Sequence, residues 1–420
     1  MNEYQIHHLK HNLHRLQSAI KWIIFSILSG LLMGLIGTLF YKCIELATLV
    51  RGEHPWLIYF LPFAGLFIIC IYKLLHNEKD SGTNLVLAAI HSGKNIPLRM
   101  APSIFISTII THLFGGSAGR EGAALQLGGS IGNALGKCFR FNESDQHIMI
   151  MCGMSAAFSA LFGTPMAAAI FSMEVVSVGV MYYVALVPCV ISSLVASGVA
   201  RSFDIHPELF SLTHIPTFGI TSSIKIAILA ILCAFVSVLF CICLHKTSQL
   251  YQKYFPNPFL RILVGGCLVT ILTLLVGSYD YNGAGMNVIH SCIMKEQVQP
   301  AAFLLKMLFT ALTLGAGYKG GEIVPSFFIG ATFGCLFGQL LGFSPALCAA
   351  VGMSSVFCGV TNCPISSLLI SFELFGYDAM PYFLLAIALS YMLSGYYGLY
   401  KSQKIIYSKF KTQYINKETH

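Results

Sequence analysis

Apolar segments, separated by short polar or glycine-containing breaks, follow one another along almost the whole chain. A run of about 20 predominantly apolar residues is long enough to cross a bilayer as a helix. Several of these segments are interrupted by Gly, Pro or pairs of polar residues, which is typical of tilted and discontinuous membrane helices. The pattern therefore predicts an all-α, polytopic membrane protein. The segments are 18–50, 55–75, 101–114, 146–162, 165–200, 222–246, 259–277, 300–316, 326–350 and 364–398.

The composition agrees with this prediction and excludes an ordinary soluble domain. Hydrophobic residues make up 56% of the 420 residues and charged residues only 10%, whereas a soluble chain carries about 25% charged residues. The formal net charge of +8 is concentrated near the two ends of the chain, so it does not require a nucleic-acid partner. The basic residues at the ends are Lys10, Arg15 and Lys21, and Lys401, Lys404, Lys409, Lys411 and Lys417.

These basic ends predict that both termini are cytoplasmic and that the chain crosses the plasma (inner) membrane an even number of times. We expect residues 1–20 to form a cytoplasmic helix on the membrane surface, 21–410 the transmembrane domain, and 411–420 a C-terminal tail. No pattern of a cleavable signal peptide is present at the N-terminus. A membrane-surface helix explains the histidines of this region better than a metal site, and we expect no metal or cofactor. These histidines are His7, His8, His11 and His14.

The second half of the chain repeats the first half. Residues 153–158 read GMSAAF and residues 352–357 read GMSSVF, and the register continues to Glu174 and Glu373 at one offset (373 − 174 = 199). Because the two glutamates are equivalent, we expect a shared structural role, such as capping backbone N–H groups of the other half, rather than a proton relay. Duplicated halves with broken helices at mid-membrane are typical of secondary transporters and related channels. The predicted pseudo-repeats are about 21–200 and 221–400.

A glycine-rich segment, 115–123 (GGSAGREGA), lies between two apolar segments and holds Arg120 and Glu121. A carboxylate at membrane depth costs a few kcal/mol or more, so it indicates a functional site. A helix that begins near Glu121 directs its positive end and its free N–H groups, including that of Gly122, at any anion there. The Arg120 side chain is a further anion-binding candidate. Glu121 is itself an anion, so it can occupy the site of a transported anion and leave that site when it is protonated. The segment therefore predicts coupling between a proton and an anion.

The second half carries its own version of this segment, residues 315–325 (GAGYKGGEIVP). Glycines again precede an apolar helix, so the N–H groups of Ile323 and Val324 can face an anion across from Glu121. Glu322 adds a second ionisable group close to the expected pathway. It is our candidate for the inner proton station, and the alternative is a solvated loop charge beside Lys319.

Other polar residues leave more than one interpretation open. Residues 79–84 (KDSGTN) contain ordinary helix-capping side chains, and they could also donate to a dehydrated anion through Ser81, Gly82, Thr83 and Asn84. Tyr407 is either an interface anchor or a single hydroxyl donor to a halide. Lys306 lies inside an apolar segment and requires a partner or a water-filled vestibule. The fourteen cysteines lie mostly inside apolar runs, and we interpret them as small buried hydrophobic side chains.

At these residues the chain resembles the CLC family of chloride channels and proton-coupled anion exchangers. Residues 119–123 (GREGA) are similar to that family's G-[KR]-E-G-P, and residues 321–325 (GEIVP) are similar to its G-x-F-x-P. The pair Ser81-Gly82 resembles the centre of G-S-G-I-P, although Asp80, Thr83 and Asn84 depart from it. Residues 404–408 resemble the segment that carries the family's anion-binding Tyr. The resemblance extends from about residue 20 to 410.

The resemblance implies a homodimer of protomers with two inverted repeats, each protomer with its own anion pathway. It also implies that Glu121 is the gating glutamate and that Ser81 and Tyr407 are the central anion donors. Exchangers of the family usually carry an inner proton glutamate at the position of Val175, and its absence favours a channel. The fluoride-exporting branch instead places a Glu where Glu322 stands.

Other positions divide between the two branches. Residues 83–85 (TNL) and 112–122 (HLFGGSAGREG) resemble the fluoride-exporting branch. That branch, however, often has Met at the position of Ser81 and Thr at that of Val324. These differences leave chloride and fluoride both open as the transported anion.

The sequence therefore predicts a CLC-type halide transporter that exchanges chloride or fluoride for protons through Glu121 and Glu322. The alternative is a passive voltage- or pH-gated chloride channel. We do not expect an enzyme, since no H-E-x-x-H motif is present. The expected partners are a halide anion, protons, the lipid bilayer and a second copy of the chain.

Overall fold

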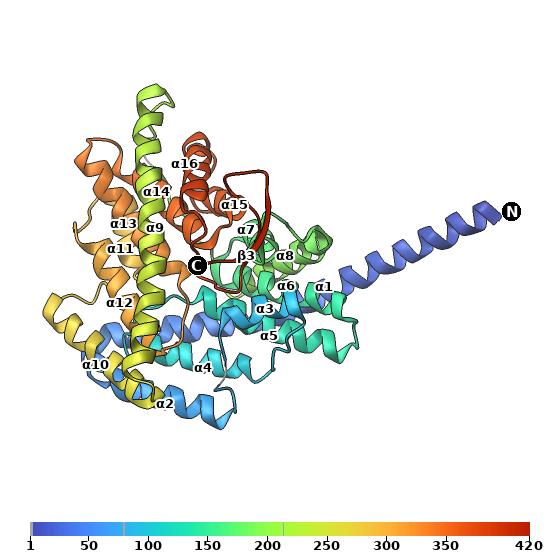
Figure 1. Cartoon of the computed structure of the whole chain (residues 1–420), viewed down its shortest axis with the longest axis horizontal. Coiled ribbons are helices and arrows are strands. Elements are labelled where there is room, and N and C mark those ends of the chain that lie inside the picture. Colours follow the sequence, from blue (N-terminus) through green and yellow to red (C-terminus); the bar gives the residue numbers. More distant parts are fainter. Residues whose placement is uncertain (1–2, 79, 213) are drawn as a thin grey trace.

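Sixteen α-helices make up most of the computed structural model, which describes residues 3–78, 80–212 and 214–420 (Figure 1). The helices of the first half are α1 (Glu3–Glu53), α2 (Leu61–Leu74), α3 (Thr83–Ser92), α4 (Met100–Leu113), α5 (Glu121–Cys138), α6 (Glu143–Phe162), α7 (Pro165–Glu174) and α8 (Leu186–Ser202). Those of the second half are α9 (Ile220–Tyr254), α10 (Pro258–Val276), α11 (Met286–Met294), α12 (Ala302–Ala316), α13 (Ile323–Leu340), α14 (Pro345–Thr361), α15 (Pro364–Phe375) and α16 (Met380–Leu393).

The helices confirm the predicted all-α membrane class and are more divided than the apolar segments suggested. Each of the segments 165–200, 326–350 and 364–398, predicted as one apolar run, contains two helices. In 326–350, for example, the chain leaves α13 at Gly342, which has a positive φ, and restarts at Pro345, the first residue of α14. Among the described residues, six helical segments are long and apolar enough to cross a membrane. The shorter helices between them are consistent with discontinuous membrane helices.

The predicted N-terminal helix is not separate from the first membrane segment. Helix α1 continues without a break from Glu3 to Glu53, and its first turns extend away from the rest of the molecule (Figure 1). The side chains of the histidine group, His7, His8, His11 and His14, lie outside the described residues.

The two halves use the same close helix packing. Helix α5 packs on α6 through Gly128, where an added Cβ would lie 2.2 Å from the carbonyl oxygen of Gly153. Helix α13 packs on α14 in the same way, since a Cβ on Gly330 would lie 2.3 Å from the carbonyl oxygen of Gly352. Small residues of this kind let helix backbones approach closely in membrane proteins. The predicted duplication is therefore also a duplication of the core.

Glu174 and Glu373 join the halves to each other by reciprocal caps. The carboxylate of Glu174, at the end of α7, accepts hydrogen bonds from the Ile365 and Ser366 N–H groups at 3.1 and 2.8 Å, at the start of α15. The Glu373 carboxylate, on α15, accepts from the N–H groups of Met166 and Ala167, both at 2.9 Å, at the start of α7. The predicted shared structural role is confirmed. Reciprocal contacts of this kind are expected of two repeats related by a pseudo-two-fold axis.

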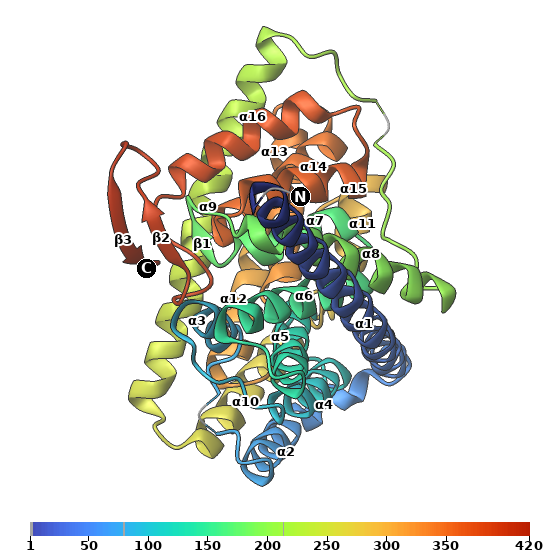
Figure 2. The same ribbon diagram turned by 90° about the vertical axis from the view of Figure 1, so that its right-hand side faces the viewer.

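A small sheet at one edge of the molecule attaches the C-terminal residues (Figure 2). Strand β2 (Lys404–Tyr407) pairs in parallel with β1 (Ser177–Val178) and antiparallel with β3 (Tyr414–Glu418). The predicted tail, 411–420, therefore contains a paired strand. Directly before β2, Gln403 is fully buried and donates to the carbonyl oxygens of Val175 and Thr361.

Candidate functional site

The site is built where the two glycine-rich segments meet. The N–H and carbonyl groups of Gly119 and Gly321 bond to each other in both directions at 2.7 Å. This bridge places the start of α5, from the first half, beside the start of α13, from the second half. Glycine is required here because a Cβ on Gly321 would lie 2.5 Å from the Gly122 nitrogen. The predicted meeting of the Glu121 segment with the start of the Ile323 helix is present.

A third helix begins at the same place. The hydroxyl of Thr83, the first residue of α3, donates to the Gly122 carbonyl oxygen at 3.3 Å, and Gln126 donates to that hydroxyl at 3.3 Å. The preceding Gly82 has a φ of +65°, which favours glycine. We call this meeting of the first turns of α3, α5 and α13 the junction.

The junction holds backbone N–H groups that the helices do not use themselves. In α13 the first helical hydrogen bond runs from the Ser326 N–H to the Glu322 carbonyl oxygen. The N–H groups of Ile323 and Val324 precede this bond and therefore have no partner within the helix. In α5 the first such bond runs from Ala124 to Arg120, which leaves the N–H of Gly122 ahead of it. Free N–H groups and the positive ends of helix dipoles favour an anion at such a place.

Glu121 is fully buried at the start of α5 and is held by few contacts. Its Oε2 accepts a hydrogen bond from the Arg120 N–H at 3.1 Å. The Nε of Arg120 lies 3.4 Å from Oε1, but this oxygen accepts no hydrogen bond among the described residues. The Arg120 guanidinium, besides this ion pair with Glu121, stacks 4.3 Å from the centre of the Tyr41 ring. A carboxyl group with so few protein partners can leave its position when its charge is removed.

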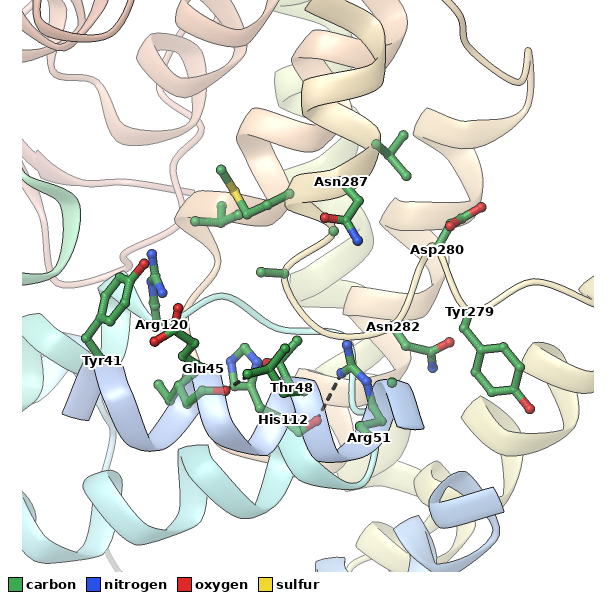
Figure 3. Close-up of a pocket in the computed structure, with 18 of the residues that line it drawn as sticks. Tyr41, Glu45, Thr48, Arg51, His112, Arg120, Tyr279, Asp280, Asn282 and Asn287 are labelled. Carbon is green, nitrogen blue, oxygen red and sulfur yellow. Dashed lines mark hydrogen bonds between the residues drawn. The ribbon is translucent and has the colours of Figure 1, made fainter. Parts of the chain in front are cut away.

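Two vestibules lead to the junction, and each contains one of the predicted glutamates. The first, about 410 Å³, is lined by Glu121, Arg120 and Val324, and by residues of α1 and of the loop before α11 (Figure 3). The second, about 380 Å³, is lined by Glu322, by residues 80–84 and by the segment 399–401. The vestibules share no lining residue. A Cβ on Gly122 would lie 3.1 Å from Oε2 of Glu322, so the Glu322 carboxyl group touches the start of α5.

The predicted anion donors of residues 81–84 all line the second vestibule. Ser81 is exposed and Thr83 is buried. Asn84 has a further contact, since its Oδ1 accepts a hydrogen bond from the Ser402 N–H at 3.0 Å. Asn84 therefore also fixes the segment that carries Tyr400. Ile323 is buried directly after Glu322 at the junction.

The structure does not bring Tyr407 to this site. Tyr407 lies on β2, its side chain is 48% exposed, and its ring packs edge-on against Tyr414. Two other tyrosines, Tyr318 and Tyr400, line the second vestibule, and both are buried. The Tyr318 hydroxyl donates to backbone carbonyl oxygens, whereas the Tyr400 hydroxyl has no hydrogen-bond partner among the described residues. The prediction missed Tyr400 because five tyrosines follow α16 and only the turn before β2 decides which one points inward. The apolar pair Leu399-Tyr400, ahead of the lysine-rich segment, was the available signal.

Lys306 is satisfied by the backbone rather than by an acid. It is fully buried on α12, and its Nζ donates to the carbonyl oxygens of Tyr281 and Gly283 at 3.1 and 2.7 Å. These contacts hold the loop that forms part of the wall of the first vestibule (Figure 3).

Comparison with known proteins agrees with this architecture. The chain is similar to a chloride/fluoride channel protein of Pseudomonas syringae pv. tomato, with 35% identity over 93% of this chain and 87% of that protein. An H(+)/Cl(-) exchange transporter, ClcA, of Vibrio cholerae is 25% identical over 84% of this chain and 81% of that protein. Among solved structures, a CLC-type fluoride/proton antiporter is 32% identical, with a TM-score of 0.89 over 92% of this chain and 98% of that one.

A more distant solved structure, a slow cyanobacterial Cl-/H+ antiporter, shares the fold with 20% identity and a TM-score of 0.75 over 89% of this chain and 94% of that one. Residues 64–395 match the family described as voltage gated chloride channel. This match covers well over half of the 420 residues. The chain is therefore a member of the CLC family of voltage-gated chloride channels.

Proposed function

We propose that this protein exchanges a halide for protons across the membrane, with fluoride as its preferred anion. One observation supports this function above the others. Two glutamates, Glu121 and Glu322, occupy two separate vestibules and both contact the junction of three helix starts. An anion and a carboxylate compete for the same N–H groups there, which gives the coupling a physical basis.

In the proposed cycle the charge of Glu121 decides whether the junction is open. As a carboxylate, Glu121 lies against the free N–H groups and excludes the anion. When it takes up a proton, its attraction to the helix ends falls and the side chain can leave, and a halide then takes its place. The proton passes to Glu322 and leaves through the second vestibule. Val175, where exchangers of the family usually carry an inner glutamate, is fully buried and has no ionisable group.

The relatives support fluoride over chloride. Two of the relatives named above exceed 30% identity, and both carry fluoride in their names, a chloride/fluoride channel protein and a fluoride/proton antiporter. The exchange transporter named for chloride is 25% identical. In the site, we assign anion binding to the N–H groups of Gly122, Ile323 and Val324 and to residues 81–84, with the Tyr400 hydroxyl in place of Tyr407.

We also propose a location and an assembly. Basic residues at both ends favour cytoplasmic termini in the plasma membrane. The first vestibule, at the C-terminal end of α1, then opens to the outside, and the second opens to the cytoplasm. The family resemblance favours a homodimer, and chemical cross-linking of the purified protein tests this: a protein that remains monomeric would contradict it.

The function is tested in proteoliposomes loaded with sodium fluoride or sodium chloride, with anion and proton fluxes recorded together. We expect fluoride efflux to exceed chloride efflux and to drive protons inward against their gradient. Glu121→Gln and Glu322→Gln should each abolish proton movement, since Gln keeps the shape of the side chain and carries no titratable proton. Fluoride efflux without proton movement in the wild type would support a passive channel instead.

A further inference from the structure

Arg51 is a cation of the first vestibule and has no acidic partner in the part of the chain that the structure describes. It lies in the last turn of α1 and lines the vestibule that contains Glu121 (Figure 3). Its Nη1 donates to the His112 carbonyl oxygen at 2.9 Å. No carboxylate oxygen lies within 4.0 Å of its side chain among the described residues. A guanidinium has five N–H donors, so most of those of Arg51 remain for a ligand.

The position of this guanidinium is fixed by the loop before α11. A Cβ on Gly283 would lie 2.6 Å from the Arg51 Nη1, so the guanidinium packs directly on the Gly283 backbone. The Gly283 N–H donates to the Gly116 carbonyl oxygen at 3.0 Å, which ties the loop to the segment before Glu121. On the same loop, Lys306 donates to the Gly283 carbonyl oxygen. Two cations therefore hold this loop, and only Lys306 is fully buried.

The other charges of the vestibule leave Arg51 as the available cation. Arg120 is engaged by the Glu121 carboxylate and the Tyr41 ring. Two further carboxylates line the vestibule, Glu45 on α1 and Asp280 in the loop. Asp280 accepts a hydrogen bond from the Ser278 hydroxyl at 2.7 Å, and Glu45 is exposed and makes no ion pair within 4.0 Å among the described residues.

We propose that Arg51 forms an outer binding site for the transported halide, on the path between solvent and Glu121. This site rests on the proposed function and extends it. A partly desolvated guanidinium attracts a small anion more strongly than an exposed one, because the effective dielectric constant near it is lower. The site raises the local halide concentration beside Glu121. It holds a halide ion either just before that ion replaces the Glu121 carboxylate or just after the carboxylate has displaced it.

The test compares three variants by the initial rate of proton-coupled fluoride uptake at increasing fluoride concentration. Arg51→Gln should raise the half-saturating fluoride concentration about three- to tenfold, with little change in the maximal rate. Asn287→Asp should raise the half-saturating fluoride concentration as well, because it adds a negative charge to the same vestibule at a side chain that makes no hydrogen bond among the described residues. Lys42→Gln removes one charge from an exposed site of α1 outside the vestibule and serves as the matched control.

If folded Arg51→Gln protein has the same half-saturating fluoride concentration as the wild type, the proposed Arg51 site is contradicted. If Arg51→Gln does not fold, Asn287→Asp decides in the same way. Line broadening of the fluoride ¹⁹F resonance by solubilised protein gives a second readout that needs no transport. If the wild type does not couple protons to fluoride, that result contradicts the proposed function but not the Arg51 site. The line broadening then tests the site by itself: a smaller broadening with Arg51→Gln supports it, and an unchanged broadening contradicts it.

Discussion

At the scale of single residues, the site is marked by buried polar atoms that the protein itself does not satisfy. Among the described residues, Oε1 of Glu121 and the Tyr400 hydroxyl have no hydrogen-bond partner. Most buried polar atoms in proteins have one, and leaving one without a partner costs about 1–3 kcal/mol. A bound anion would accept a hydrogen bond from the Tyr400 hydroxyl. A protonated Glu121 carboxyl group carries an O–H, so it can itself donate a hydrogen bond.

Tyr400 provides the sharpest test at this scale. Tyr400→Phe removes the hydroxyl and keeps the ring, so we expect the half-saturating fluoride concentration to rise about five- to tenfold, as for one lost hydrogen bond. Tyr407→Phe is the matched control and should have no effect, because Tyr407 lies half-exposed on β2. Fluoride uptake by proteoliposomes measures both. Equal effects of the two substitutions would contradict the assignment of Tyr400.

The residues of the junction differ in how far the sequence could predict them. Glu121 and Glu322 stand out because charge beside glycine and within apolar segments has few structural explanations. Tyr400 does not stand out, since tyrosines are common where helices leave the membrane. The inward position of Tyr400 depends on the turn that follows it. Hydrogen bonds from Gln403 to Val175 and Thr361, and from Ser402 to Asn84, fix this turn. These contacts join positions far apart in the sequence.

At the scale of helices, the reciprocal caps between α7 and α15 connect the halves. Glu174 accepts three hydrogen bonds, two from backbone N–H groups and one from the Ser366 hydroxyl, whereas Glu373 accepts two. Replacement of Glu by Gln leaves one oxygen to accept and removes the charge. We therefore expect Glu174→Gln to lower the thermal unfolding temperature in detergent more than Glu373→Gln does. The opposite order would contradict the account of the caps.

Close packing of α5 on α6 gives a second prediction at this scale. Gly128→Ala places a methyl group about 2.2 Å from the Gly153 carbonyl oxygen, so the helices must separate, at a cost of about 1–3 kcal/mol. Gly198→Ala on α8 is the matched control, since no atom lies within 4 Å of its added Cβ. It should be neutral or stabilise by up to about 1 kcal/mol. Thermal unfolding measures both, and a destabilising effect of Gly198→Ala alone would contradict this packing.

Helix boundaries were harder to predict than helix content. The apolar character of 326–350 continues across the turn between α13 and α14, so hydrophobicity alone joins two helices that pack against each other. The signals of the break, Gly342 and Pro345, are single residues within an apolar run. Residues 1–20 posed the opposite problem, because a change from polar to apolar composition falls within one continuous helix.

At the scale of the whole molecule, duplication explains how a pathway forms at the centre. Each half provides a glycine-rich helix start, and the Gly119–Gly321 bridge joins them. The matched register between residues 153–174 and 352–373 was visible in the sequence, and it predicted the repeats. The reciprocal contacts across the halves were not visible, since one sequence gives no distances between its parts. The two vestibules that share no lining residue follow from this arrangement.

In the proposed mechanism the anion and the proton use one junction in alternation. This alternation is tested most directly by the voltage at which net transport stops in proteoliposomes under a fixed fluoride gradient and a varied pH gradient. An exchanger couples the two gradients, so we predict that this voltage moves steadily as the pH gradient changes, and that Glu121→Gln removes this dependence. A voltage that stays at the equilibrium potential of fluoride at every pH gradient would contradict the account.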